Sequence, residues 1–179
     1  MNGMRRIVIG TCVTVGAGSF VGCGGSQPAA PAATAGAELP ADFFLASEPA
    51  GAAFVEAAKK AAKAGDEIVI RGRIGGSESP FVENRAVFTI VGPGIKACSD
   101  IEGDLCEMPW DYCCETAETI AAHSATIRVV DDQGALIRAS VKGKGGVKEL
   151  SDVIVKGKVA QAQGAVLVVH ASGIFVAKP

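Results

Sequence analysis

Four cysteines close together in the second half of the chain are the residues whose spacing most directly implies chemistry. Cys98, Cys106, Cys113 and Cys114 lie within 17 residues, in a stretch (92–124) that contains no convincing strand pattern. In an exported chain, a long loop with clustered cysteines indicates two disulfides. A bond between Cys113 and Cys114 would strain the backbone, because bridged cysteines prefer Cα atoms about 5.5 Å apart. We therefore expect Cys98 and Cys106 each to pair with one of these two adjacent cysteines.

A metal site is the alternative chemistry for this loop. Four thiolates can bind zinc, but structural zinc sites usually contain C-x₂₋₄-C pairs, which the loop lacks. The loop is also acidic, with Lys96 against Asp100, Glu102, Asp104, Glu107, Asp111, Glu115 and Glu118. The run from Asp100 to Asp104 imitates the start of a calcium loop, but Leu105 stands where that loop needs glycine. We expect a solvated acidic rim without metal or cofactor, and zinc or calcium binding is the second hypothesis.

Two aromatic residues stand beside the cysteines. Trp110 and Tyr112 are the only tryptophan and the only tyrosine of the chain. A loop fixed by disulfides loses little entropy on binding, so its aromatic side chains are suitable anchors for a partner. The competing interpretation, which we favour, is that Trp110 folds back and closes one end of the domain.

Catalysis is not expected from this sequence. His123 and His170 are the only imidazole bases, and neither lies in a recognisable nucleophile or zinc-protease motif. The chain also has no Cys-x-x-Cys motif that would supply a reactive thiol beside a resolving partner. We predict no catalytic residue.

The N-terminus carries an export signal. Arg5 and Arg6 precede an apolar run (7–21) that ends in Gly22-Cys23, which is typical of a secretory signal peptide. This ending looks like the lipobox of bacterial lipoproteins, which implies a signal peptide over 1–22 and a lipid (palmitate) on Cys23. Gly24 after the cysteine is compatible with transport to the outer membrane. The sequence thus predicts a lipid-anchored protein of the cell envelope.

The remainder divides into a tether and one domain. Residues 23–41 are rich in Gly, Ser, Pro and Ala, which predicts a flexible tether. The domain covers 42–179 and is long enough for one core. Ser47 and Pro49 predict the start of a helix that runs to Ala64. The strand-like segments are Glu67–Ile74, Ala86–Val91, Thr126–Asp131, Ala135–Lys142, Asp152–Ala160 and Ala165–Val176.

Two of these strands nearly repeat each other. The segments 67–74 and 152–159 each read acid, three β-branched residues, base, Gly, base, β-branched residue. A glycine inside a strand indicates a bend or the close approach of another backbone. Alternation directs Ile68, Ile70, Val153 and Val155 inward and leaves four bases outward: Arg71, Arg73, Lys156 and Lys158. We interpret these bases first as a solvated face and second as a surface for an acidic partner.

These patterns resemble an OB-fold of the anticodon-binding-like variety. The matching segments are Ile68–Ile74, Asp131–Gly134, Val153–Val159 and Ala171–Ile174. The resemblance implies a mainly β fold, a small closed barrel with an N-terminal helix and the cysteine-rich loop inserted after its second strand. Three further stretches, 72–76, 88–91 and 109–114, look like a family of exported bacterial lipoproteins. That likeness implies no particular activity.

Composition argues against a nucleic-acid ligand. The net charge is −2 and aromatic residues make up 5% of the chain, whereas single-strand binding needs a basic groove and aromatic platforms. We therefore expect a non-catalytic binding or interaction module at the envelope, whose partner is an unidentified protein or small ligand. Metal binding through the cysteine loop is the alternative function.

Overall fold

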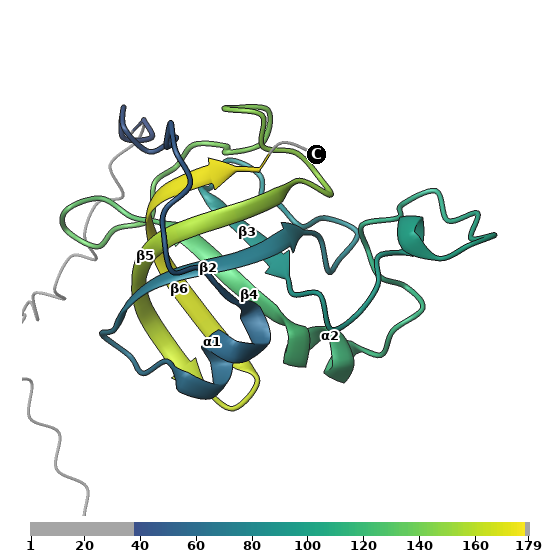
Figure 1. Ribbon diagram of the computed structural model, residues 1–179. Coiled ribbons are helices and arrows are strands. Elements are labelled where there is room, and N and C mark those ends of the chain that lie inside the picture. The colour runs from purple at the N-terminus through teal and green to yellow at the C-terminus, as the bar shows by residue number, and fades with distance from the viewer. Residues whose placement is uncertain (1–37, 178–179) are drawn as a thin grey trace, which may run out of the picture. The chain divides into compact units, whose positions relative to one another are not determined.

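The computed structural model describes residues 38–177, and the fold is mainly β (Figure 1). The signal peptide (1–22), Cys23 and most of the tether lie outside the described residues. The strands are β1 (Ala53–Phe54), β2 (Glu67–Ile74), β3 (Val87–Val91), β4 (Ser124–Val129), β5 (Asp152–Gln163) and β6 (Val166–Val176). The helices are α1 (Val55–Ala61), the single 3₁₀ turn η1 (Cys98–Asp100) and α2 (Ala117–His123).

The strands form one mixed sheet of six strands in the order β1-β2-β3-β4-β6-β5. β5 also pairs antiparallel with β2 along seven positions, from Glu67 opposite Lys158 to Arg73 opposite Asp152. β4 and β6 are parallel, whereas β5 and β6 form a long antiparallel pair. The pairing therefore returns from the last strand in the order to β2.

Side chains alternate across these strands as the sequence predicts. Ile70, Val153 and Val155 are fully buried in one core cluster, and Ile68 packs against it. Arg71 on β2 is half-buried and Lys156 on β5 is exposed, on the opposite face. The predicted inward and outward directions in these two strands are confirmed.

The repeated glycines allow neighbouring backbones to approach. A Cβ at Gly157 would lie 2.2 Å from the carbonyl oxygen of His170 on β6. A Cβ at Gly72 would lie 2.9 Å from the carbonyl oxygen of Val91 on β3. The register of β5 against β6 shifts between Lys156 and Gly157, which marks a β-bulge at this contact.

The first helix is shorter than the sequence pattern predicts. Helix α1 begins at Val55, and the preceding residues Ala53–Phe54 pair with β2 as strand β1. Gly51, at φ +79°, interrupts any helix that starts at Ser47. The predicted helix over 47–64 is therefore wrong at both ends, and only its central part forms.

The expected strand over 135–142 does not form a ladder. The segment makes one isolated bridge, between Val130 and Leu136. Its alternating side chains Ile137 and Val141 are buried, so the hydrophobic pattern correctly marked the core but not the pairing. The turn before it forms as expected, with the Asp131 side chain accepting the amides of Gln133 and Ala135.

The long insert between β3 and β4 holds the cysteines. It leaves and re-enters the sheet at one place, because the Gly92 amide donates to the His123 carbonyl at 2.8 Å. Between these residues the loop projects away from the strands, toward the right of Figure 1. Among the described residues, no helix is both long enough and apolar enough to span a membrane.

Candidate metal centre

The inner end of the cysteine loop is fixed to the domain. Cys98 is only 1% exposed, and its amide donates to the Pro109 carbonyl. Beside it, Ala97 and Tyr112 are buried against Val91, the last residue of β3. Cys98 is thus the anchored member of the cluster, whereas Cys113 and Cys114 lie at the surface.

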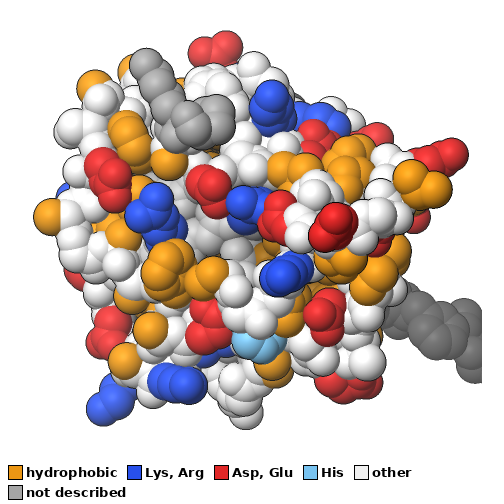
Figure 2. All heavy atoms as spheres, turned by 45° about the vertical axis from the view of Figure 1, so that its right-hand side comes forward, with side chains coloured by type: hydrophobic (Ala, Val, Ile, Leu, Met, Phe, Trp, Pro, Cys, Tyr) orange, Lys and Arg blue, Asp and Glu red, His pale blue; other side chains and the backbone are white. Residues whose placement is uncertain are grey.

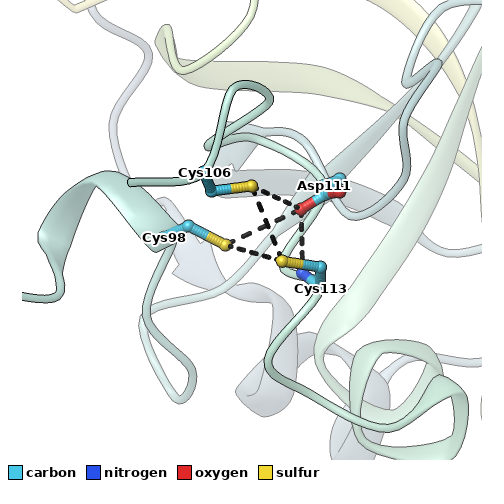
Figure 3. Close-up of side chains that lie close together, drawn as sticks. All are labelled: Cys98, Cys106, Asp111 and Cys113. Carbon is cyan, nitrogen blue, oxygen red and sulfur yellow. Dashed lines mark hydrogen bonds between the residues drawn. The ribbon is translucent and has the colours of Figure 1, made fainter. Parts of the chain in front are cut away.

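Three sulfurs and one carboxylate oxygen converge in this loop (Figure 3). The Sγ atom of Cys113 lies 3.6 Å from both the Cys98 and the Cys106 Sγ atoms. Oδ1 of Asp111 lies 3.6 Å from the Cys98 sulfur and 4.0 Å from the Cys106 sulfur. All four atoms lie within 4.8 Å of one another.

These separations match the edges of a metal-centred tetrahedron. Zinc–sulfur bonds of about 2.3 Å place two sulfurs about 3.8 Å apart, and a sulfur and an oxygen about 3.6 Å apart. Four of the six separations, at 3.6–4.0 Å, are close to these values, and the other two lie within 4.8 Å. They are too long for a disulfide, whose sulfurs are about 2.0 Å apart.

The predicted disulfides stay a prediction. All four described cysteines are free thiols here. Cys98 and Cys106 both face Cys113, whereas the Cys114 sulfur faces Oδ2 of Asp104 at 3.7 Å. Cys98 therefore has two cysteine sulfurs within 4.8 Å, those of Cys113 and Cys114.

Backbone geometry orients the carboxylate toward the sulfurs. Oδ1 of Asp111 accepts the Cys113 amide at 2.8 Å, which closes a tight turn around Tyr112. Tyr112 has φ +60°, an unusual conformation for a residue with a side chain. Metal sites usually show such support, in which each ligand is held by further hydrogen bonds.

The cluster disfavours negative charge on its exposed sulfur. Hydrogen bonds with the Cys98 and Cys106 sulfurs, followed by partial desolvation and the nearby Asp111 carboxylate, raise the pKa of the Cys113 thiol. A thiol in this position stays protonated until a cation compensates the charge. The site thus has the donor atoms for a soft cation and lacks a positive group of its own.

An arginine connects the loop to the sheet. Arg73 on β2 contacts Asp100 of the loop at 2.5 Å and Asp152 of β5 at 3.5 Å. Although partial burial opposes its charge, these carboxylates raise the pKa of Arg73. Asp100, the first residue of the calcium-like pattern, is therefore directed to Arg73 and belongs to neither potential ligand group.

The two aromatic residues face the protein. The Trp110 indole N–H donates to the Glu78 carbonyl at 3.0 Å, and its side chain is half-buried. Tyr112 is 2% exposed, and burial raises the pKa of its hydroxyl to about 12. Tyr112 is consequently a packing residue, and Trp110 offers only part of its ring to a partner.

The four bases predicted to share a face do so, but acids accompany them. Arg71 and Arg73 lie on β2, and Lys156 and Lys158 lie on the neighbouring β5. Arg71 lies 3.9 Å from Glu48, and Lys158 is opposite Glu67 in the ladder. Figure 2, which brings the right-hand side of Figure 1 forward, shows blue and red side chains intermixed rather than one basic patch.

Sequence reasoning missed a carboxylate–imidazole pair at the end of the insert. Nδ1 of His123, the last residue of α2, lies 2.8 Å from Oε1 of Glu56 on α1. The same oxygen accepts the Gly94 amide at 2.9 Å. Burial opposes ionisation, but these hydrogen bonds lower the pKa of Glu56. Nothing in the sequence links two residues 67 positions apart.

Comparison with known proteins adds no assignment. No family model, no curated protein and no solved structure matches the chain.

Proposed function

We propose that this protein is a non-catalytic, zinc-binding module of the cell envelope. Zinc would bind the sulfurs of Cys98, Cys106 and Cys113 and one oxygen of Asp111. The observation that carries the proposal is the convergence of these four atoms within 4.8 Å, with four of their six separations at 3.6–4.0 Å. Thiolates with a carboxylate suit zinc, whereas calcium takes oxygen ligands alone.

The ligand set favours a structural role for the ion. Four protein ligands fill a tetrahedral zinc ion and leave no position open for a substrate. The loop around the site has little regular structure, with one 3₁₀ turn before α2. An ion at its centre would hold the loop together, as structural zinc does in small domains.

The proposed task of this fixed loop is to recognise a partner, a protein or a small ligand. Trp110 precedes the ligand Asp111 directly, so the ion would fix the backbone on which the indole stands. Trp110 also borders a surface hollow lined by Phe81 and Val82, and Val82 is 44% exposed. These side chains supply the apolar and aromatic area that binding surfaces use.

We further propose that the sheet is a closed, OB-like barrel with α1 as its N-terminal helix. The ring of pairings β2-β3-β4-β6-β5-β2 supports closure, since each of these strands has a partner on both sides. The parallel pair β4 and β6 inside an otherwise antiparallel ring also fits the order of strands in that fold. Attachment to the membrane by a lipid on Cys23 completes the proposal.

The decisive experiment distinguishes bound zinc from disulfides by mass. The chain is exported and purified without added reductant, offered zinc and weighed under native and denaturing conditions. The proposal expects a zinc ion retained in the native spectrum and all cysteines of the loop reduced after denaturation. A mass lower by four hydrogens, without metal, would contradict it.

Adjacent cysteines offer a matched pair of variants. Cys113→Ser removes a proposed ligand, and Cys114→Ser removes the neighbouring thiol outside this ligand set. With cobalt in place of zinc, the unchanged chain and Cys114→Ser should show the strong visible absorption of tetrahedral cobalt thiolate. Cys113→Ser should lose most of it. Equal spectra from the two variants would count against the assigned ligands.

A further inference from the structure

Cys114, which is not a ligand in the proposed zinc site, belongs to a second group of potential ligand atoms. The sulfurs of Cys98 and Cys114 and one oxygen of Asp104 lie within 4.8 Å of one another. Oδ2 of Asp104 lies 3.7 Å from the Cys114 sulfur, close to the sulfur–oxygen edge of about 3.6 Å in a zinc tetrahedron. Cys98 belongs to both groups, and the other two residues belong to this one alone.

The second group is also oriented by the backbone. The other oxygen of Asp104, Oδ1, accepts the Cys106 amide at 2.6 Å. The carboxylate is thus held between a residue of the first group and the free thiol of Cys114. Asp104 is half-buried, whereas Cys114 lies at the surface and leaves room for a water ligand beside its sulfur.

We propose that the loop binds a second divalent cation of the zinc type at Cys98, Asp104 and Cys114, with the Cys98 sulfur bridging the two ions. This inference rests on the proposed zinc site, which supplies the first ion and the Cys98 thiolate. A thiolate sulfur bound to one ion keeps lone pairs that a second ion can use. Water fills the fourth position of the second ion, so this ion is held less tightly than the first.

Charge favours the second ion. Three thiolates and a carboxylate leave a formal charge of −2 on the first zinc site. Asp100, Glu102 and Glu107 lie in the same loop, and Lys96 is the single lysine or arginine between 86 and 127. A second cation offsets this accumulation of negative charge, which Arg73 alone only partly balances.

The proton count follows from the ligands. The first ion displaces one proton from each of three thiols, those of Cys98, Cys106 and Cys113. The second ion meets a Cys98 sulfur that has already given up its proton to the first binding step, and Asp104 supplies a carboxylate oxygen. It therefore displaces a single proton, from Cys114.

Cadmium is the probe, because it replaces zinc and reports on its ligands by nuclear magnetic resonance. The reduced full chain is titrated with cadmium without oxygen, and bound ions are counted by native mass spectrometry. We expect two ions, three protons released with the first and one with the second. With isotopically enriched cadmium, the two signals should show scalar coupling to each other through the Cys98 sulfur.

Three variants locate the second ion. Cys114→Ser and Asp104→Asn should bind one ion, with the three-proton release unchanged. Glu102→Gln, which removes a charge from the same loop outside both ligand groups, should bind two. A chain that stops at one ion in excess cadmium, or a Cys114→Ser variant that binds two, overturns the second site and leaves the first intact. A chain that binds none overturns both sites.

Discussion

At the residue scale, Glu56 is the side chain whose charge has the clearest structural partner. Its oxygen Oε1 contacts His123 at the end of α2 and the Gly94 amide in the insert. One carboxylate thus connects helix α1 to both ends of the inserted segment. Its depressed pKa means that the folded protein favours the ionised form.

We predict that Glu56→Gln destabilises the protein by about 1 kcal/mol at neutral pH, a value reduced by partial solvent exposure. The folded pKa is lower than the ordinary value of 4.5. The stabilisation is therefore complete above that value and disappears as the pH falls through the folded pKa. Urea unfolding at neutral pH and well below pH 4.5 measures the difference.

The control for this prediction is Glu83→Gln, at an exposed position in a turn. It should leave the free energy of unfolding unchanged at both pH values. A deficit of Glu56→Gln that is equally large in acid would show that lost packing, rather than lost charge, causes the effect.

At the scale of the strand, the contact between β5 and β6 depends on Gly157. A methyl group there meets the His170 carbonyl at 2.2 Å and the Ala171 Cα at 2.9 Å. Neither group is a flexible side-chain end, so the strands must separate. We predict that Gly157→Ala costs more than about 2 kcal/mol of unfolding free energy, measured in urea.

Gly164, in the turn between the same two strands, is the comparison. A Cβ there contacts nothing within 4 Å, but its φ of +56° disfavours alanine. Gly164→Ala should cost about 1 kcal/mol, from backbone strain alone. If both variants lose the same stability, the close approach at Gly157 is not the determining factor.

How far the sequence predicts the structure also differs by element. β2 has the predicted bounds, and β5 and β6 lie over the predicted segments, because their apolar alternation is set by one buried face. The strand expected over 135–142 has the same alternation. Its backbone, however, makes only isolated hydrogen bonds to neighbouring segments and no continuous ladder with another strand. A local sequence pattern therefore predicts which side chains are buried. Which strands pair depends on the segments that the fold places next to each other.

The candidate site shows the same limit. The sequence identifies the four cysteines as one cluster, and their order in the chain leaves their partners open. Asp111 joins the candidate ligand group because its side chain turns back onto the Cys113 amide, beside the sulfurs. The contact of the Cys114 sulfur with Asp104 is likewise a property of the folded loop. The sequence contains no C-x₂₋₄-C pair, so the spacing of the cysteines along the chain argued against zinc. The ligand atoms come together only in the folded loop.

At the scale of the whole molecule, we predict that metal removal opens the insert to protease without unfolding the sheet. Lys96 is exposed and is the single trypsin site between 86 and 127. A chelator should increase trypsin cleavage after Lys96, and zinc should reverse the increase. Cleavage rates are read by mass spectrometry of the fragments.

Cleavage at Lys144 supplies the internal control. This lysine lies in an exposed turn outside the insert, between Val141 and Val147. Its cleavage should be independent of chelator. An equal increase at both lysines would mean that the ion stabilises the entire domain, and no change at Lys96 would count against an ion in the loop.

The predicted lipid anchor determines where the whole molecule is located, and its residues lie outside the described part of the chain. We predict that Cys23→Ser abolishes incorporation of a labelled fatty acid and leaves the signal peptide uncleaved at that position. Cys12→Ser, within the apolar run, should leave labelling intact. Labelling that persists in Cys23→Ser would place the lipid elsewhere.

The hydrogen bond between the Gly92 amide and the His123 carbonyl joins the two ends of the insert. The insert could therefore be replaced by another loop. The hydrogen bond continues the pairing of Val91 with Ser124 between β3 and β4, so the two strands stay aligned whatever the chain does between them. A short turn could join them in place of the cysteines, and a different loop could be grafted there. The loop that carries the proposed metal site could therefore be exchanged for another while the pairing of β3 with β4 is kept.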